Sequence, residues 1–332
     1  MQFHSLAKSL ALAATLLAAL AAPVAAQVKE HTFKVGIGLS DDHPQAQAVR
    51  HFAERLQAKS GGKMNAKLFA SGALGNDVSM TSALRGGTLE MTIPDSSTLM
   101  SLIKPFGVLN LPLTFNNEAE ADAVLDGPFG QKLLAMLPDK GLIGLGFWEN
   151  GFRQITNNRR AINTPEDLKG IKLRVPNGEW RIKMFQAYGA SPSPMPLSEV
   201  FVALQTGVMD GQENPYAQIY PSRFYEVQKY LSISNHVYTP AFVTAGRSWD
   251  KFDPEVQQAL TETAVEMQDV VYGIAADLEK DLLQKLTEAG MAVNEVDTAA
   301  FVAASQPIYD QFAQSVEGAG ALIEKAQGLS GE

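Results

Sequence analysis

The 332-residue sequence predicts an α/β fold in two lobes with a cleft between them. Strand-like and helix-like segments alternate from residue 33 onward, and the alternation starts again near residue 150. No repeat, low-complexity tract or flexible linker separates the two units, so we expect strands to cross directly between the lobes. A helical pattern over residues 253–290 would span about 50 Å, which is enough to brace both lobes.

The first unit begins with a β-α-β-α-β order, which implies a parallel sheet with right-handed crossovers. Its strands are predicted at residues 33–39, 63–69 and 89–94. Apolar residues at helical spacing, closed by paired glycines, predict the intervening helices within residues 41–62 and 76–87. Two short helices and one buried strand then follow, at residues 118–127, 128–137 and 142–148.

The second unit repeats the alternation of strands and helices. Thr164 before Pro165, with acidic residues at the next two positions, is typical of a helix start. The alternating residues 171–175 predict a strand, which stops at a Pro-Asn-Gly turn. Further elements are predicted at residues 179–189, 198–207, 208–215 and 241–246.

The long helical pattern sets the expected lobe boundaries. It starts at Asp253-Pro254 and stops at Gly290, and we expect a kink at Gly273 near its middle. The first lobe is then predicted to comprise residues 27–150 with about 239–279. The second lobe is predicted to comprise residues 151–238 with about 280–332.

Residues 1–26 have the pattern of a secretory signal peptide. Lys8 precedes a long apolar run, and Val24 and Ala26 stand at the −3 and −1 positions of a small-residue cleavage site. We therefore expect export to the periplasm with cleavage after about Ala26. The alternatives are a buried N-terminal helix or an uncleaved anchor. No later segment reaches 18 consecutive apolar residues, so the rest of the chain is predicted to be soluble.

The composition excludes several classes of function. Residues 1–26 hold one Lys and no acid, so the remainder has 26 basic and 36 acidic residues, a net charge of −10. That charge argues against a nucleic-acid partner. Without cysteine the chain has no disulfide, thiolate nucleophile or zinc–thiolate site. Motifs for a nucleophile elbow, a phosphate loop and an HExxH zinc site are absent, so we predict no catalytic residue, metal site or cofactor.

Polar residues at the carboxyl ends of predicted strands are the candidate binding residues, because ligands of open parallel sheets bind there. They are Arg174, Asn214 and Asp95, joined by Arg153 where the chain enters the second unit. Two arginines and an asparagine suit a carboxylate, which accepts parallel hydrogen bonds from a guanidinium. Each residue also has a structural alternative: an exposed charge for Arg174, a turn for Asn214, an ion pair for Arg153 and a helix cap for Asp95.

At these residues the sequence resembles the substrate-binding proteins of TRAP transporters, the tripartite ATP-independent periplasmic carriers, in a DctP-like family. The resemblance covers essentially the whole chain after residue 26. It is most specific in RQITNNRRAINTPEDLKGIKLRVPNG, GASPSPMPLSEVFVALQTGVMDGQENP and FYEVQKYLSISNH, and SGALGNDVSM and DDHP also match. It implies a two-lobed periplasmic binding protein with strand crossovers and one long helix spanning both lobes. It also implies that the lobes close on a ligand and dock on membrane permease subunits driven by an ion gradient.

The resemblance implies roles for individual residues. Arg174 matches the arginine of KLRVP that clamps the ligand carboxylate in the family, and Asn214 matches the assisting asparagine of GQENP. Arg153 matches the arginine of GFRQ that lies beside the same group, and Asn177 matches the polar residue of VPN. Asp95 falls where other members carry an acid that helps to select the ligand. Four further candidates are His43, Asp77, Asn150 and Trp148, the last with a core position as its alternative.

The expected ligand is a small organic acid bound by a monomer. Thr98 stands where the sialic-acid branch of the family is expected to have an arginine, which argues against sialic acid. Asp95 would repel a second carboxylate and accept hydroxyl hydrogen bonds, so we expect a hydroxylated monocarboxylate such as a sugar acid. A C4-dicarboxylate is the alternative, which a protonated His43 would favour. A binding protein of an ATP-driven importer or a chemoreceptor, and a lyase with Asp95 or His43 as base, are the other readings.

Overall fold

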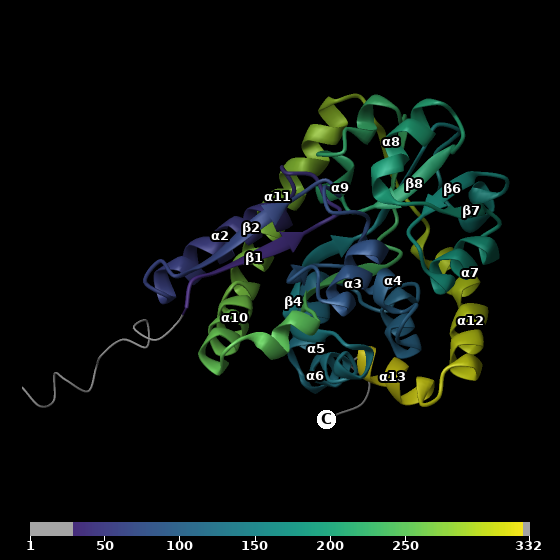
Figure 1. The fold of residues 1–332 in the computed structure, drawn as a ribbon. Helices are drawn as coiled ribbons and strands as arrows, with labels where there is room; N and C mark the ends of the chain where they lie inside the picture. The colour runs from purple at the N-terminus through teal and green to yellow at the C-terminus, as the bar shows by residue number, and fades with distance from the viewer. Residues whose placement is uncertain (1–28, 328–332) are drawn as a thin grey trace, which may run out of the picture.

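The computed structural model describes residues 29–327, which form two lobes, each around its own β-sheet (Figure 1). The predicted two-lobed α/β fold is therefore confirmed. The predicted signal peptide lies outside the described residues. Within residues 29–327, the helices are all too short or too polar to cross a membrane.

The sheet of the first lobe has five strands in the order β2-β1-β3-β10-β4. Strand β1 pairs in parallel with β2 and β3, as the β-α-β-α-β order predicts, whereas β10 is antiparallel to β3 and β4. The strand bounds are β1 (His31–Gly36), β2 (Met64–Phe69), β3 (Met91–Thr92), β4 (Ile143–Phe152) and β10 (Tyr238–Ala245). Buried Phe33 and Val35 pack there with Phe52 and Leu260 from the covering helices.

Several helices of this lobe begin at a polar side chain that caps them. Asn76, Asp95 and Asn117 each accept a hydrogen bond from a backbone N–H of the first turn that follows. The helices are α2 (Pro44–Lys59), α3 (Asp77–Gly86), α4 (Ser96–Leu99), η2 (Lys104–Asn110), α5 (Glu118–Asp126), α6 (Pro128–Leu134), η3 (Pro138–Lys140), η6 (Arg247–Lys251) and α10 (Pro254–Glu266). These caps fix where each helix starts, and two of them place residues of the cleft.

The sheet of the second lobe has six strands in the order β11-β9-β5-β8-β6-β7. Strand β6 runs parallel to both β7 and β8, so the carboxyl ends of β6 and β8 meet at one edge. The strands are β5 (Gln154–Asn157), β6 (Lys172–Val175), β7 (Ser191–Pro194), β8 (Gly211–Asn214), β9 (Tyr230–Ile233) and β11 (Ala292–Glu295). The helices are η4 (Pro165–Leu168), α7 (Glu179–Ala187), α8 (Leu197–Gln205), α9 (Tyr216–Ile219), η5 (Phe224–Glu226) and α12 (Thr298–Ser315).

The chain crosses between the lobes without a linker. Strand β4 of the first sheet leads through Arg153 into β5 of the second sheet, and β9 leads back into β10. The outgoing and returning strands pair at the crossing point, where Phe152 lies opposite Tyr238. Main-chain hydrogen bonds therefore join the two connections where they leave the first lobe.

The predicted helix over residues 253–290 is two helices, α10 and α11 (Gln268–Glu288), interrupted at Met267. The interruption lies at Met267 and not at Gly273, through which α11 continues. Met267 still donates to the carbonyl of Thr263 and accepts from Val271, so the interruption is local. Helix α11 contacts α2 and β4 of the first lobe and α9 of the second, so this segment does span both lobes.

The C-terminal helices link the lobes a second time. Helix α12 packs on α7 of the second lobe, and α13 (Ala319–Ala326) returns to lie against η2 of the first lobe (Figure 1). Trp180 of α7 meets Phe312 of α12 edge to face, with ring centroids 5.1 Å apart.

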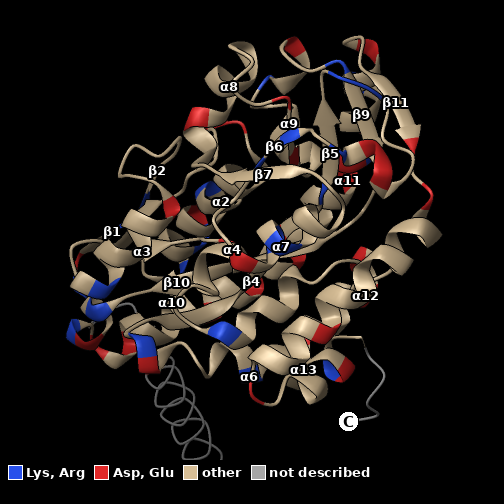
Figure 2. Cartoon of the chain, turned by 90° about the vertical axis from the view of Figure 1, so that its right-hand side faces the viewer, with Lys and Arg blue, Asp and Glu red and all other residues tan. Residues whose placement is uncertain are grey.

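The predicted lobe boundaries stay a prediction. Figure 2 shows Lys and Arg interspersed with Asp and Glu along the elements rather than collected on one of them.

Replacing Gly273 by Ala is expected to stabilise the protein. Gly273 is exposed inside α11, and an added Cβ would meet nothing within 4 Å. Alanine costs less conformational entropy in a helix, so the free energy of unfolding should rise by roughly 0.5–1 kcal/mol in urea titrations. Gly211→Ala is the contrasting variant, since its Cβ would lie 2.3 Å from the carbonyl oxygen of Thr156. A loss of stability in Gly273→Ala would show that α11 is not a regular helix there.

Candidate functional site

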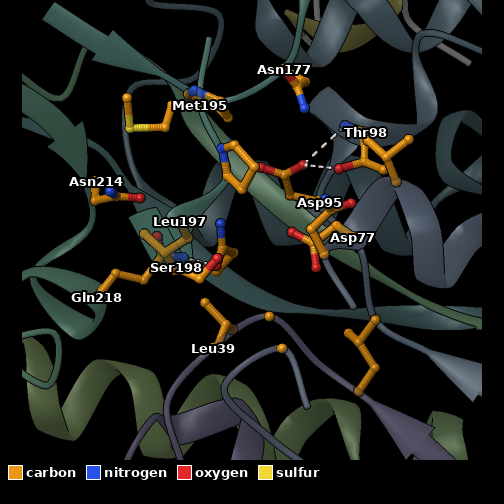
Figure 3. Close-up of a pocket in the computed structure, with 18 of the residues that line it drawn as sticks. Leu39, Asp77, Asp95, Thr98, Asn177, Met195, Leu197, Ser198, Asn214 and Gln218 are labelled. Atoms are coloured by element: carbon orange, nitrogen blue, oxygen red, sulfur yellow. Dashed lines mark hydrogen bonds between the residues drawn. The ribbon is translucent and has the colours of Figure 1, made fainter. Parts of the chain in front are cut away.

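A cavity between the lobes, counted together with the open solvent at its mouth, comprises about 790 Å³ of space free of protein atoms. Side chains of both lobes line it, among them Leu39, Gln45, Asp77, Asp95, Thr98, Asn150, Arg153, Arg174, Asn177, Met195, Leu197, Ser198, Asn214 and Gln218. Figure 3 shows Asp77, Asp95 and Thr98 on one side of it and Asn214 and Gln218 on the other. The predicted residues at strand ends are therefore brought together at this cavity.

Arg174 presents a buried guanidinium to the cavity. It lies on β6, one residue before the strand ends, and is only 4% exposed. Its Nε and Nη2 atoms both donate to the carbonyl oxygen of Met195, at 2.9 and 2.6 Å, which fixes the plane of the fork. Within residues 29–327 no carboxylate forms an ion pair with it, and Nη1 has no hydrogen-bond partner. Burial, with Arg153 nearby, lowers the pKa of Arg174 to about 10, so it stays charged at neutral pH.

Arg153 also lines the cavity, but its charge is already paired. Its Nε and Nη2 atoms donate to the two carboxylate oxygens of Glu213 at 2.5 and 3.1 Å. Nη2 also donates to the side-chain oxygen of Asn214 at 2.9 Å, so Arg153 orients that amide. Arg153 is therefore both an ion-pair partner, as the alternative interpretation predicted, and a residue that lines the cavity.

Glu213 is the centre of a buried charge network. Arg181 donates to it at 2.6 Å from α7, and His236 Nε2 lies 3.0 Å from the same oxygen. Burial alone would raise the pKa of Glu213, but Arg153 and Arg181 outweigh burial and hold that pKa well below its usual range. Burial lowers the pKa of His236 to about 4, so this imidazole is neutral at neutral pH.

The network continues into the first lobe. Arg181 donates to the side chain of Asn110 on η2, and Asn110 hydrogen-bonds Ser96 and Ser97 at the start of α4. The same short helix carries Asp95 as its cap, so one chain of hydrogen bonds positions polar groups on both sides of the cavity.

Asp77 and Asp95 place two carboxylates on the first-lobe side. Asp95 accepts from the backbone N–H and the hydroxyl of Thr98, at 3.1 and 3.2 Å (Figure 3). Asp95 therefore does cap a helix, as the alternative interpretation predicted, and it also lines the cavity. Burial and the neighbouring Asp95 raise the pKa of Asp77 to about 7, although Arg174 opposes the shift. Asp77 is thus close to half protonated at neutral pH and can donate or accept a hydrogen bond.

The remaining predicted residues divide between the cavity and the core. Asn177 and Asn150 line the cavity, and Asn150 accepts from Gln218 at 2.6 Å. His43 instead caps α2, with Nδ1 accepting from the backbone of Gln45, and burial lowers its pKa to about 3. Trp148 is buried in the first-lobe core and donates to a main-chain carbonyl. The structure places neither His43 nor Trp148 on the cavity.

Four important side chains were missed by the sequence reasoning. Glu213 and Arg181 carry the buried network, and Gln45 and Gln218 line the cavity. The Gln45 side-chain oxygen is buried with no hydrogen-bond partner, so it is available to a ligand hydroxyl. Gln45 directly follows DDHP, and Glu213 lies inside GQENP, so the quoted motifs contain or adjoin both residues.

The arrangement is suited to binding an anion that also carries hydroxyl groups. The second lobe offers guanidinium and amide donors, and the first lobe offers acceptors. Among residues 29–327, no group of three or more His, Asp or Glu side chains is placed so as to hold a metal ion. The described residues thus offer hydrogen bonding and charge pairing to a ligand in the cavity.

Known proteins with similar sequences and structures match nearly the whole chain. The family model "Bacterial extracellular solute-binding protein, family 7" (DctP) matches residues 35–315. The 2,3-diketo-L-gulonate-binding periplasmic protein YiaO of Escherichia coli K12 is 36% identical, over 91% of this chain and 93% of its own. The sugar acid binding protein DctPAm of Advenella mimigardefordensis DPN7T, in complex with galactonate, is 40% identical with a TM-score of 0.88, over 92% and 100%. The C4-dicarboxylate-binding protein DctB of Bacillus subtilis 168 is 34% identical, over 76% and 73%.

Replacing Glu213 by Gln is expected to destabilise the fold by about 3–5 kcal/mol, because it leaves two buried guanidiniums without their counter-charge. The measurement is urea unfolding at neutral pH. The depressed pKa of Glu213 stabilises the wild type above the ordinary glutamate pKa, and this contribution is lost as the pH falls. Glu213→Gln should therefore show a smaller loss on acidification.

Glu226→Gln is the matched control, since Glu226 pairs with Arg223 at the exposed surface. That variant should lose no more than about 1 kcal/mol. Equal effects of the two substitutions would contradict a structural role for the buried network.

Proposed function

Because the chain belongs to the DctP family of bacterial extracellular solute-binding proteins, family 7, we propose that it captures a sugar acid in the cleft and delivers it to a TRAP permease. Its ligand is a hydroxylated monocarboxylate, and it acts as a monomer with the membrane subunits as partners. The observation that carries the proposal is the buried guanidinium of Arg174, which has no carboxylate partner in the described chain.

Arg174 would clamp the ligand carboxylate. Its fork is held by Met195 with Nη1 left over, and Asn214 lies at the end of the neighbouring strand. A carboxylate gains most from a guanidinium where water is excluded, because the hydrogen bonds are charge-assisted and the local dielectric is low. Arg153 contributes by orienting Asn214 more than by its own charge, which Glu213 neutralises.

The charges around the cavity favour one carboxylate over two. Around the cavity, the guanidinium groups of Arg153, Arg174 and Arg181 lie near three carboxyl groups, those of Glu213, Asp95 and Asp77. Because a protonated Asp77 carries no charge, the guanidinium groups then outnumber the remaining carboxyl groups by one. A second carboxylate near Asp77 and Asp95 would meet like charge, whereas hydroxyl groups would meet acceptors. This supports a sugar acid, as in the DctPAm complex with galactonate.

The C4-dicarboxylate alternative has support from the likeness to DctB. It is weakened by the position of His43, which was expected to help with a second carboxylate but lies off the cavity with a lowered pKa. For the same reason His43 is not available as the base of a lyase. We propose that the protein is not an enzyme and has no catalytic residue.

We also propose export to the periplasm with cleavage after about Ala26. The support is the sequence pattern of residues 1–26, namely Lys8, the apolar run and the small residues at the cleavage site. Amino-terminal sequencing of the protein recovered from the periplasm would test it, and an intact Met1 would contradict it.

Arg174→Ala is expected to weaken galactonate binding by roughly 10²–10³-fold or more in titration calorimetry, because the ligand carboxylate would lose its buried partner. Arg174→Lys should be nearly as weak, since an ammonium cannot make the forked pair. Wild-type protein should bind galactonate more tightly than succinate.

The control is Arg159→Ala, which removes an exposed arginine of the same lobe and should leave the affinity unchanged. Thermal unfolding without ligand checks that each variant is folded. An Arg174→Ala affinity within about threefold of the wild type would refute the clamp. Tighter binding of succinate than of galactonate would favour the dicarboxylate reading.

A further inference from the structure

A second cavity lies between the lobes, on the crossover side of the cleft. Together with the open solvent at its mouth, it comprises about 300 Å³ of space free of protein atoms. Asn150 lines both this cavity and the ligand cleft, so the two are neighbours. Its walls come from β4, α5 and α11 and from the start of α9 in the second lobe: Glu118, Glu149, Asn150, Gly151, Phe152, Pro215, Tyr216, Ala217, Ala275, Glu279 and Leu282. Relative movement of the lobes must therefore change this cavity as well as the cleft.

The cavity is lined by acids with no basic partner. Glu118, Glu149 and Glu279 face it, and Asp122 adjoins them; we call these four residues the crossover carboxyl cluster. Within residues 29–327, none of the four forms an ion pair with a Lys, Arg or His side chain. Glu149 is 5% exposed, and its Oε1 atom has no hydrogen-bond partner. A buried acid without a counter-ion is costly unless it is protonated.

The hydrogen bonds of the cluster require bound protons. The Tyr238 hydroxyl lies 2.9 Å from Glu149 Oε2 and 3.1 Å from Asp122 Oδ1. Its single proton cannot serve both carboxylates fully, so a second proton on one of the acids completes the arrangement. The Glu279 carboxyl group lies beside that of Glu118 and, after burial, is the main cause of the raised pKa of Glu118.

Four elements around the cluster add further acids or phenols. Helix α5 contributes Asp126, α11 contributes Asp269 and Tyr272, β10 contributes Tyr238, and α9 contributes Tyr216. Burial raises the pKa of Glu149 well above its usual value, and the acids around it raise it further. Burial raises the pKa of Glu118, and the neighbouring Glu279 carboxyl group raises it further, to about 8.

We propose that the crossover carboxyl cluster is a proton-binding site that holds α5 and β4 against α11 behind the cleft and so couples the arrangement of the lobes to pH. Loss of its protons would place several like charges around one shared cavity. Their repulsion would act on the α5–α11 contact and on the start of α9, which belong to different lobes. The proposal concerns a different site from the ligand clamp and does not depend on which ligand binds.

The sign of the pH effect follows from the raised pKa values. Between the ordinary glutamate pKa and about pH 8, the folded cluster binds more protons than the unfolded chain. The protonated cluster contributes its whole share of the free energy of unfolding below that pH window, and this contribution is lost as the pH rises through the window. The unfolding temperature of the ligand-free protein should therefore fall between about pH 7 and about pH 9, above the range in which the lowered pKa values of His43 and His236 act in the opposite direction.

The first experiment measures that fall in four proteins, all carrying Asp77→Asn because Asp77 also has a raised pKa. They are the Asp77→Asn parent, and the parent with Glu149→Gln, with Glu118→Gln or with Glu317→Gln. The first two added changes should reduce the fall to about half or less, since each removes a titrating group and keeps its shape. Glu317 is exposed on the surface, so its change should leave the fall as in the parent.

The second experiment measures the lobe arrangement directly. The chain has no cysteine, so Ser82→Cys on α3 and Glu199→Cys on α8 allow one spin label on each lobe. In the parent, the distance distribution should differ between about pH 5.5 and about pH 8.5, and Glu149→Gln should remove most of that difference. Equal pH slopes in parent and Glu149→Gln, or a distance that ignores pH, would overturn the proposal. Calcium that raises the unfolding temperature of the parent but not of Glu149→Gln would also overturn it, because the occupant would then be a metal ion.

Discussion

The cleft depends on how three buried guanidinium groups are neutralised. Glu213 pairs with both Arg153 and Arg181, so the hydrogen bonds and ion pairs of these two guanidinium groups are directed at one buried carboxylate inside the second lobe. Arg174 differs from these two arginines because it donates to the carbonyl oxygen of Met195, which orients the guanidinium without neutralising its charge. A buried cation without a counter-charge is unfavourable in the empty protein, and an incoming carboxylate relieves that cost. The affinity for an acid therefore has its source in the pairing pattern rather than in the overall charge, which is negative.

The fold explains why these groups meet. Parallel pairing of β6 with β8 brings Arg174 and Asn214 to one sheet edge, and the β4–β5 crossover places Arg153 beside them. Glu213 and Asn214 are neighbours on β8, so the network and the cleft share one strand. The link from Arg181 through Asn110 to α4 then ties the donor side of the cleft to the acceptor side. Movement of one lobe relative to the other would disturb this chain of hydrogen bonds.

The sequence predicted the architecture where local patterns were strong. Paired glycines and alternating apolar residues located α3, β2 and β6, and the restart after residue 150 located the second lobe. It failed where a long-range contact decides the outcome. The interruption of the long helix is at Met267, which is fully buried in the first-lobe core, and not at the exposed Gly273. Helices α12 and α13 went unpredicted.

The candidate site was predictable only in part, for a similar reason. Arg174, Asn214 and Asp95 could be found because strand ends and turn residues mark them locally. Whether an arginine is paired depends on residues far away in the chain, and the 60-residue separation of Arg153 and Glu213 hides that pairing from any local pattern. The same holds for the crossover carboxyl cluster, whose members lie on three separate elements and look like ordinary surface acids in the sequence.

A crystal structure of the protein grown with galactonate tests the central claim most directly. The account predicts one ligand in the cleft, with its carboxylate oxygens about 2.7–3.2 Å from the guanidinium nitrogens of Arg174 and its hydroxyl groups toward Asp77 and Asp95. A carboxylate bound elsewhere, with the Arg174 fork facing solvent or a protein acid, would contradict it.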